Sequence, residues 1–289
     1  MIQHLTRDQL DEKRYNQCIS SAANSRIYAY SWYLDIVCDD WNVLVKGNYH
    51  MVMPLPKRKK YGINYIYQAP WIQQLGIFSS SSIDASMIEE FIRAIPKKFK
   101  LIDIFFNAEN RFTSKHMSVR YNYILQLNTD FNTIKSKYNK NRKRISKKDF
   151  NNITIDKNGS VNAFLSLYKE LEKGYKTHKD SVEKLQKLLS SGNTNVHIWN
   201  VFKNKNVIAG LCWLEDSFRI TYLVPLATTL AKKENIPTYI VNELIKEHSK
   251  KNLVLDFEGS MIAGVARFYR SFGAEKEEYF WYKRKVYRL

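Results

Sequence analysis

Residues 253–273 read LVLDFEGSMIAGVARFYRSFG, and this stretch decides the fold. A short apolar run ends at Asp256 and Glu258, which indicates a buried strand with polar side chains at its carboxyl end. The following residues predict a helix that ends at Gly273, because glycine is favoured just after a helix, and Tyr269 lies four residues before it. In α/β folds the carboxyl end of such a strand borders the ligand crevice. The stretch therefore predicts an α/β fold with a site at this strand end.

The residues around this stretch add strands and helices to the same unit. Ser160 is predicted to cap an amphipathic helix, and a second amphipathic helix follows it. Residues 196–216 predict a hairpin, and residues 217–225 predict a third strand. Pro237 opens the amphipathic helix that precedes the deciding strand, because proline is favoured in the first turn. Residues 277–289 predict a closing strand.

The first half of the chain has the same order of elements. It begins with helices, the first predicted from a capping box at residues 6–9. A hairpin with its turn at Gly47, a third strand and a helix that starts at Asp84 follow. Residues 84–107 and 237–260 thus occupy equivalent places, each a helix, a lysine pair and a strand. We interpret the chain as α/β (α+β), a tandem of two related units, each a mixed, mostly antiparallel sheet flanked by helices. Two unrelated α/β lobes are the alternative.

Positive charge is concentrated where the first half gives way to the second. The 289 residues include 46 Lys and Arg against 28 Asp and Glu, a net charge of +18, and residues 131–150 carry eight basic side chains and one acidic one. Such a run either contacts several phosphates or is a solvated surface. We therefore expect a first unit at residues 1–130, a basic junction at 131–150 and a second unit at 151–289. The functional interpretation places tRNA or another polyanion at Lys135 to Lys148.

Composition and missing motifs exclude several classes of protein. Cys18, Cys38 and Cys212 are far apart and have neither disulfide-framework nor zinc-site spacing, which favours a reducing compartment and no metal. The chain has no P-loop, GxGxxG, GxSxG or HExxH motif. No stretch approaches the roughly 20 apolar residues of a membrane span. We expect a cytoplasmic protein without a transmembrane segment.

The deciding stretch resembles the acyltransferase fold of the GNAT superfamily. In the last motif of that family an aromatic hydroxyl precedes a glycine by four residues, as Tyr269 precedes Gly273. DFEGS at residues 256–260, GVARFYRSFGA at 264–274 and the basic YNKNRKRISKKD at 138–149 are similar to the FemAB-type, double-GNAT branch. The members of that branch transfer acyl or aminoacyl groups to amines. The resemblance implies an N-acyltransferase that uses acyl-CoA, without a metal, and acts on a small-molecule or peptide amine in a cleft between its two units.

The resemblance also implies roles for particular residues. Tyr269 matches the family's general acid, and its phenol is expected to protonate a leaving thiolate of similar acidity. Glu258 is the candidate base, because burial at a strand end can raise the pKa of a carboxylate. The alternatives are a core aromatic for Tyr269 and a helix cap or an ion pair with Arg267 for Glu258. The residues expected to hold acyl-CoA are Tyr222, Leu223, Val224, Lys232, Lys233, Asn235, Pro237 and Thr238. The expected acceptor contacts are Tyr65, Tyr67, Gln68 and Trp71, or these four form an aromatic core strand and loop.

The loop after the third strand departs from the GNAT pattern. Typical members carry R/Q-x-x-G-x-G/A there, and its bare amides hold the CoA pyrophosphate. Here residues 227–240 read ATTLAKKENIPTYI and contain no glycine. The helix start at Pro237 and Thr238 is expected to offer free N–H groups instead, beside Lys232 and Lys233. Fem-type transferases also lack the glycine loop and use aminoacyl-tRNA, so an aminoacyl-tRNA-dependent transferase is the second enzymatic function that we consider. The non-enzymatic alternative is a module that binds RNA or an anionic membrane.

Overall fold

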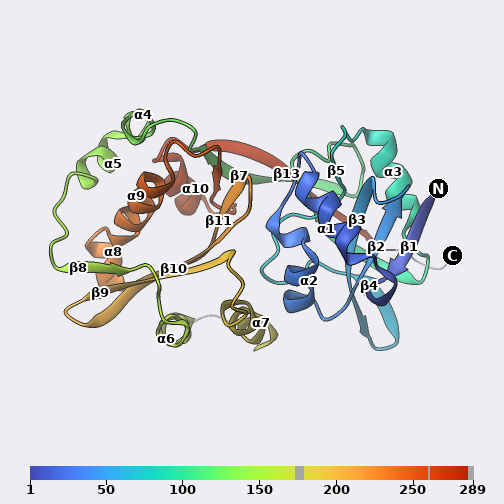
Figure 1. The fold of residues 1–289 in the computed structure, drawn as a ribbon, viewed down its shortest axis with the longest axis horizontal. Helices are drawn as coiled ribbons and strands as arrows, with labels where there is room; N and C mark the ends of the chain where they lie inside the picture. The colour runs from blue at the N-terminus through green and yellow to red at the C-terminus, as the bar shows by residue number, and fades with distance from the viewer. Residues whose placement is uncertain (173–178, 260, 286–289) are drawn as a thin grey trace. The chain divides into compact units, whose positions relative to one another are not determined.

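The computed structural model describes residues 1–172, 179–259 and 261–285. The chain forms two compact units, which are described here one at a time. Unit 1 consists of Met1–Tyr121 with Glu278–Leu289, and unit 2 is Asn122–Glu277. Strands β7 (Met117–Gln126) and β13 (Glu275–Lys285) each run from one unit into the other (Figure 1).

The limits of the units differ from the boundaries expected from the sequence. The closing strand was expected in the second unit, but most of β13 belongs to unit 1, where it pairs with β6 from Phe280↔Phe106 to Lys285↔Leu101. The basic junction belongs to unit 2. There it forms two short helices, α4 (Phe131–Ser136) and α5 (Lys140–Ile145), whose Ile134 and Ile145 are buried. Because these helices each bury an apolar residue, the junction is packed onto unit 2, while most of its basic side chains are exposed to solvent.

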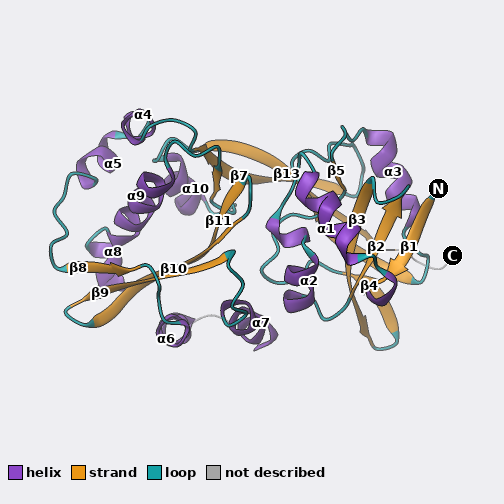
Figure 2. Cartoon of the chain, viewed as in Figure 1, coloured by secondary structure: helices purple, strands orange, loops and turns teal. Residues whose placement is uncertain are grey.

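Unit 1 is a mixed sheet with helices on its faces (Figure 2). Its strands pair antiparallel, except for β4 and β6, which are parallel and are joined through helix α3. Ile88, Phe91 and Ile92 of α3 belong to one hydrophobic core with residues of the sheet. The strands are β1 (Ile2–Thr6), β2 (Trp41–Lys46), β3 (Met51–Lys60), β4 (Ile63–Ile66), β5 (Phe78–Ser79) and β6 (Phe99–Phe106). The helices are η1 (Arg7–Gln9), α1 (Glu12–Ser21), η2 (Ile27–Ala29), α2 (Ser31–Val37) and α3 (Ala85–Ala94).

Unit 2 has the same arrangement of strands. Its strands pair antiparallel, except for β11 and β12, which are parallel and are joined through helix α9. The strands are β8 (Ile153–Asp156), β9 (Val196–Lys203), β10 (Asn206–Glu215), β11 (Arg219–Ala227) and β12 (Val254–Asp256). The further helices are α6 (Val161–Leu171), α7 (Lys179–Leu189), α8 (Thr229–Lys233), α9 (Ile236–His248) and α10 (Ala263–Arg270). The matching parallel pair in each unit confirms the expected fold class, a tandem of mixed, mostly antiparallel sheets.

Alternation along β10 places helices on both faces of the unit 2 sheet. Ala209 and Leu211 belong to the core that includes α9 and α10. Gly210 lies between them and faces the other side, where an added Cβ would approach the Phe164 ring of α6 to 2.9 Å. Successive strand residues point to opposite faces, so α6 covers one face, and α9 and α10 cover the other (Figure 1).

The N-terminus is the main local departure from the sequence prediction. The capping box is present, with the Thr6 N–H and hydroxyl both 3.0 Å or less from Gln9 Oε1, but it opens only the single turn η1. Residues 2–6 form strand β1 instead, in register with β2 from Ile2↔Lys46 to Thr6↔Asn42. This strand forms because β2, about 40 residues along the chain, pairs with it. The five residues themselves therefore contain no pattern from which the strand could be predicted.

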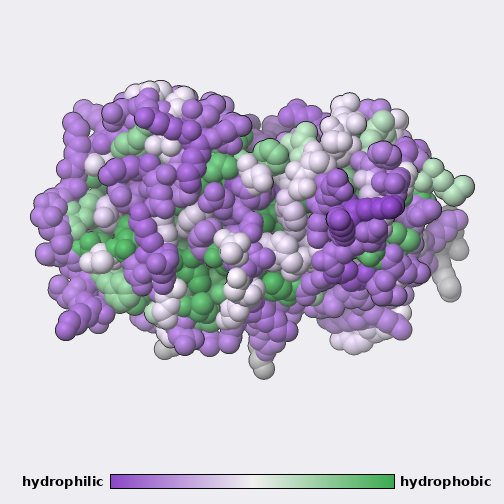
Figure 3. Space-filling model, viewed as in Figure 1, coloured by the Kyte–Doolittle hydropathy of each residue, from purple (hydrophilic) through white to green (hydrophobic). Residues whose placement is uncertain are grey.

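The face of the molecule drawn in Figure 3 is mainly hydrophilic, in keeping with the many charged side chains.

Candidate active site

The two parallel strands of unit 2 separate partway along their length. Strand β11 pairs with β12 only over Arg219↔Val254 to Thr221↔Asp256. Beyond that point β12 ends, whereas β11 continues to Ala227 in register with β10. From Tyr222 onward β11 therefore has no paired residue of β12 beside it, and this separated part of β11 lines a pocket.

A buried ion pair holds the strands together at the point where they part. Arg219 Nη1 donates to Asp256 Oδ2 at 2.7 Å, and both side chains are almost fully buried. Glu277 Oε1 lies 3.6 Å from Arg219 Nη2 and provides a second negative charge. The Glu258 N–H donates to Asp256 Oδ1 at 2.8 Å, which ties the residue after the strand to the same carboxylate. Because Asp256 contacts both strands and the following turn, it sets where the separation begins.

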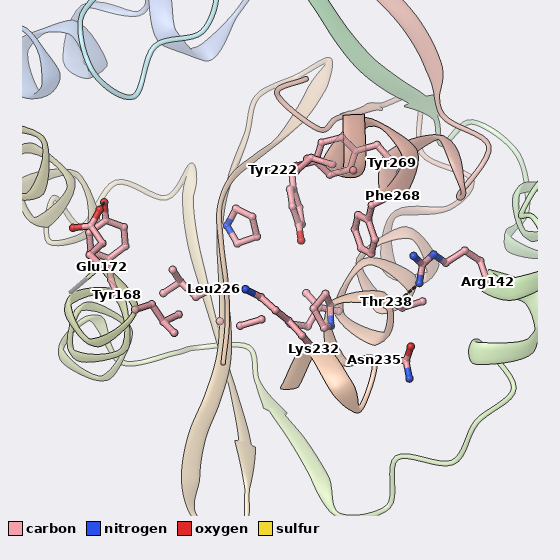
Figure 4. Close-up of a pocket in the computed structure, with 18 residues that line it drawn as sticks. Arg142, Tyr168, Glu172, Tyr222, Leu226, Lys232, Asn235, Thr238, Phe268 and Tyr269 are labelled. Atoms are coloured by element: carbon pink, nitrogen blue, oxygen red, sulfur yellow. Dashed lines mark hydrogen bonds between the residues drawn. The ribbon is translucent and has the colours of Figure 1, made fainter. Parts of the chain in front are cut away.

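The pocket has a volume of about 600 Å³, and all of its lining residues belong to unit 2. Most come from the separated part of β11, from α6 and from α5, α9 and α10, and β10 and α8 contribute Gly210 and Lys232. Figure 4 shows Tyr222, Phe268 and Tyr269 together, and Tyr168 with Glu172 in another part of the lining. The lining residues are Arg142, Tyr168, Leu171, Glu172, Gly210, Tyr222, Pro225, Leu226, Ala227, Lys232, Asn235, Pro237, Thr238, Ile240, Gly264, Val265, Phe268 and Tyr269.

Tyr269 lies in this pocket on an aromatic platform. Its ring stacks on Phe257 with centroids 4.6 Å apart and meets Tyr222 edge-on at 6.2 Å. Within the described residues, its hydroxyl makes no hydrogen bond. Burial raises the pKa of Tyr269 well above its ordinary value, and the nearby Glu258 and Asp256 carboxylates raise it further. The phenol is therefore neutral at ordinary pH, and it is a weaker acid than a thiol, contrary to the expected similar acidity.

Glu258 lies beside Tyr269 but outside the pocket lining. It has a left-handed backbone with φ of 55°, next to Gly259 with φ of 61°, so the chain turns sharply after β12. The charge of Glu258 contributes to the raised pKa values of both Tyr269 and Cys212. The carboxylate is thus electrostatically coupled to the proposed acid. Ser260, the next polar residue of the predicted strand end, lies outside the described residues.

The residues expected to hold the donor divide into two sets. Those that line the pocket are Tyr222, Lys232, Asn235, Pro237 and Thr238, and those that do not are Leu223, Val224 and Lys233. Lys233 lines a different depression together with Glu234.

The start of α9 corrects one expectation about phosphate binding. Pro237 has no N–H, and the Thr238 N–H donates to the Asn235 carbonyl at 3.0 Å. Asn235 takes the left-handed conformation before the helix, with φ of 68°. These positions therefore do not provide the free N–H groups that the sequence analysis assigned to them.

Two charged lining residues were missed by the sequence analysis. Arg142 of α5 donates from Nε to Ser271 Oγ at 2.7 Å and from Nη1 to Thr238 Oγ1, so it joins the basic junction to α9 and α10. Glu172 follows α6 and accepts a hydrogen bond from the Tyr168 hydroxyl. In the sequence, Arg142 is one of eight basic residues in a run, and Glu172 is one of many surface-type glutamates. The basic run was the only feature of the sequence that pointed to this region, and it gave no reason to choose Arg142 over the other basic residues.

The expected acceptor contacts lie in unit 1 and are engaged with their own unit. Gln68 donates to the Ile72 carbonyl at 2.5 Å and accepts from the Phe105 N–H at 3.1 Å. The Trp71 carbonyl accepts from the Tyr33 hydroxyl. Tyr67 is buried, its ring lies 4.3 Å from the Arg58 guanidinium, and Tyr65 packs edge-on against it. These contacts give Gln68 and Tyr67 structural roles in unit 1.

Two searches of the described residues give negative findings. In residues 1–172, 179–259 and 261–285, His, Cys, Asp and Glu side chains form no group of three or more that could hold a metal ion. Over the same ranges, no helix combines the length and hydropathy that a membrane span requires.

Comparison with known proteins shows the fold of the whole chain. No protein-family model and no curated protein sequence matches it. Among solved structures, FemX is similar with a TM-score of 0.67 and 10% identity, over 96% of both chains. A tandem GNAT protein from the clavulanic acid biosynthesis pathway is similar with a TM-score of 0.57 and 8% identity, over the full length of both. L-PGS from Bacillus licheniformis is similar with a TM-score of 0.52 and 11% identity, over 96% of this chain and 93% of that one. The chain therefore has the FemAB-like, double-GNAT fold.

Proposed function

We propose that the protein is an N-acyltransferase and that the pocket of unit 2 holds its acyl donor. The observation that carries this proposal is the separation of β11 from β12 above a pocket lined by Tyr269. An extended acyl chain can lie along the separated edge of β11, where backbone groups are available to it. A neutral phenol at the same place can supply a proton to the leaving group.

The reaction is a direct attack of the amine on the donor carbonyl. The amine nitrogen forms the new C–N bond, and the negative charge passes to the carbonyl oxygen. The backbone N–H group of Tyr222, which lines the pocket, is proposed to stabilise this oxyanion. The C–S or C–O bond then breaks, and Tyr269 gives its proton to the departing thiolate or alkoxide. The products are an amide and a free thiol or hydroxyl, and Tyr269 regains a proton from solvent.

A carboxylate must take the proton that the amine loses. Glu258 is the proposed base, because its charge acts on Tyr269 and its position follows the end of β12. Glu172 lies on the α6 side of the same pocket, where its charge attracts a protonated amine as it approaches. The two residues are thus proposed for different steps, proton removal and acceptor binding.

The donor is proposed to be acyl-CoA, with an aminoacyl ester of tRNA as the second candidate. Three observations favour the ester. A phenol with a strongly raised pKa gives its proton readily to an alkoxide but unfavourably to a thiolate, whose conjugate thiol has a pKa of about 8.5. The missing glycine loop and the occupied N–H groups at the start of α9 also weigh against the usual pyrophosphate site of CoA.

The proposal is tested by mixing the protein with donor and acceptor and looking for the amide by mass spectrometry. One series uses acetyl-CoA and longer acyl-CoAs, and the other uses a mixture of aminoacyl-tRNAs, each with a panel of primary amines. Amide formation from either series, lost in Tyr269→Phe, supports the proposal, and the productive series identifies the donor. If tRNA binds with a steep salt dependence and neither series yields an amide, the chain is an RNA-binding module instead.

A further inference from the structure

Arg142 is a positive charge placed inside the pocket without a negative partner. Its guanidinium is half-buried and lies 4.6 Å from the Phe268 ring centroid and 5.4 Å from that of Phe272. Nε and Nη1 donate to the hydroxyls of Ser271 and Thr238, which are neutral acceptors. Among the described residues no carboxylate pairs with it, and burial lowers the pKa of the guanidinium. Every contact of the guanidinium orients it, and none neutralises it.

The unfavourable free energy of an unpaired guanidinium in the pocket lining indicates that Arg142 binds an anionic group. Withdrawing a charge from water without a counter-charge is unfavourable, and for the half-buried Arg142 part of this cost applies. Here three separate elements hold the side chain in place: α5 carries it, Thr238 lies in the first turn of α9, and Ser271 follows α10. The remaining Nη2 group belongs to a fork whose planar geometry matches the oxygens of a phosphate. Lys232 adds a second positive charge to the lining of the same pocket.

We propose that Arg142 binds a phosphate group of the acyl donor, in place of the glycine loop that the chain lacks. The identity of the donor rests on the proposed function, whereas phosphate binding by Arg142 does not. The site lies near the reacting group, because Arg142 contacts Phe268, whose ring centroid is 5.8 Å from that of Tyr269. The phosphate could belong to CoA or to the terminal nucleotides of tRNA, since the recognising chemistry is the same.

The test compares Arg142→Met with Arg270→Met. Methionine keeps an apolar stem against Phe268 and removes the charge. Arg270 is an exposed arginine of α10 outside the pocket lining, so its variant removes the same charge from the same unit. Thermal shift is measured with inorganic pyrophosphate at low ionic strength, because a ligand that binds only the folded state raises the midpoint. We expect the affinity to fall about ten- to a hundredfold in Arg142→Met, the range for a lost charge-assisted hydrogen bond.

The outcomes separate this inference from the proposed function. Loss of the pyrophosphate shift in Arg142→Met alone supports the inference, even if no acyl transfer is detected. An equal loss in both variants, or no shift in the wild-type protein at millimolar pyrophosphate, overturns it, even if acyl transfer occurs. If Arg142→Met does not fold, phenylglyoxal modification of the wild-type protein replaces it: pyrophosphate should shield Arg142 and leave Arg270 reactive, and equal labelling overturns the inference. Repeating the shift with coenzyme A and with deacylated tRNA identifies the source of the phosphate.

Discussion

Asp256→Asn should destabilise unit 2 by about 3 kcal/mol. The Asp256 side chain is fully buried and the Arg219 side chain is 9% exposed, with 2.7 Å between Nη1 and Oδ2. Breaking such a pair usually costs about 3–5 kcal/mol, because the remaining charge stays buried. Glu277 at 3.6 Å still faces Arg219, which places the cost at the lower end. The amide substitution keeps an oxygen to accept the Glu258 N–H, so the change reports mainly on the charge.

Native-state hydrogen exchange measures this change in unit 2 alone, which matters because a chain with two units need not unfold in one step. The slowest amides of β10 and β11 should exchange roughly a hundredfold faster in Asp256→Asn. Glu247→Gln is the matched control, because it breaks the exposed pair with Lys157 and should cost less than about 1 kcal/mol. If Asp256→Asn exchanges within threefold of Glu247→Gln, the ion pair does not hold the two strands together, and the reasoning fails.

Four further outcomes are expected. Tyr269→Phe should lower the rate of acyl transfer by a factor of about 10²–10⁴. It should change the free energy of unfolding by less than about 1 kcal/mol, because the ring contacts remain. A transfer rate within threefold of wild type would show that Tyr269 is not the general acid. Glu258→Gln should lower kcat, whereas Glu172→Gln should raise KM for the amine, and the reverse pattern would exchange their roles. Burial raises the pKa of Tyr269, so its contribution to the stability of the folded state is complete below about pH 10, where the unfolded phenol titrates, and is lost as the pH rises further. Above pH 10 the melting temperature of the wild-type protein should therefore fall more steeply than that of Tyr269→Phe. Equal slopes in the two proteins would contradict this. Burial raises the pKa of the Cys18 thiol to about 11, so a thiol reagent at pH 8 should label it only after unfolding, and rapid labelling of the native protein would show that it is exposed.

Much of the fold could be predicted from the sequence because its signals are local. Ser160 and Asp84 cap the helices that they were predicted to cap, accepting from the N–H groups of Ala163 and Met87. Strand β9 spans the predicted run Val196–Lys203. Helix α9 and strand β12 likewise follow the periodicity of their own residues. The equivalence of the two units could be predicted for the same reason, as an order of locally encoded elements.

The site could be predicted only in part, because its geometry depends on distant pairings. Tyr269 was singled out by the resemblance to the last GNAT motif, in which an aromatic hydroxyl precedes a glycine by four residues, and it lies in the pocket. Arg142 was not singled out, because the residues that orient it, Thr238 and Ser271, are 96 and 129 positions away. The sequence analysis also did not predict strand β1 or the place of β13 in unit 1. Each of these strands is fixed by pairing with a strand far away along the chain, β2 for β1 and β6 for β13.

Amide hydrogen exchange of the wild-type chain, with and without a saturating acyl donor, tests the central claim most directly. The donors are acetyl-CoA and a hydrolysis-resistant, amide-linked aminoacyl-tRNA. If the pocket of unit 2 holds the donor, one of the two should slow exchange in β11, Arg219–Ala227, and in the first turns of α9. Protection confined to unit 1, or no protection by either donor, would contradict the assignment of the donor site to unit 2.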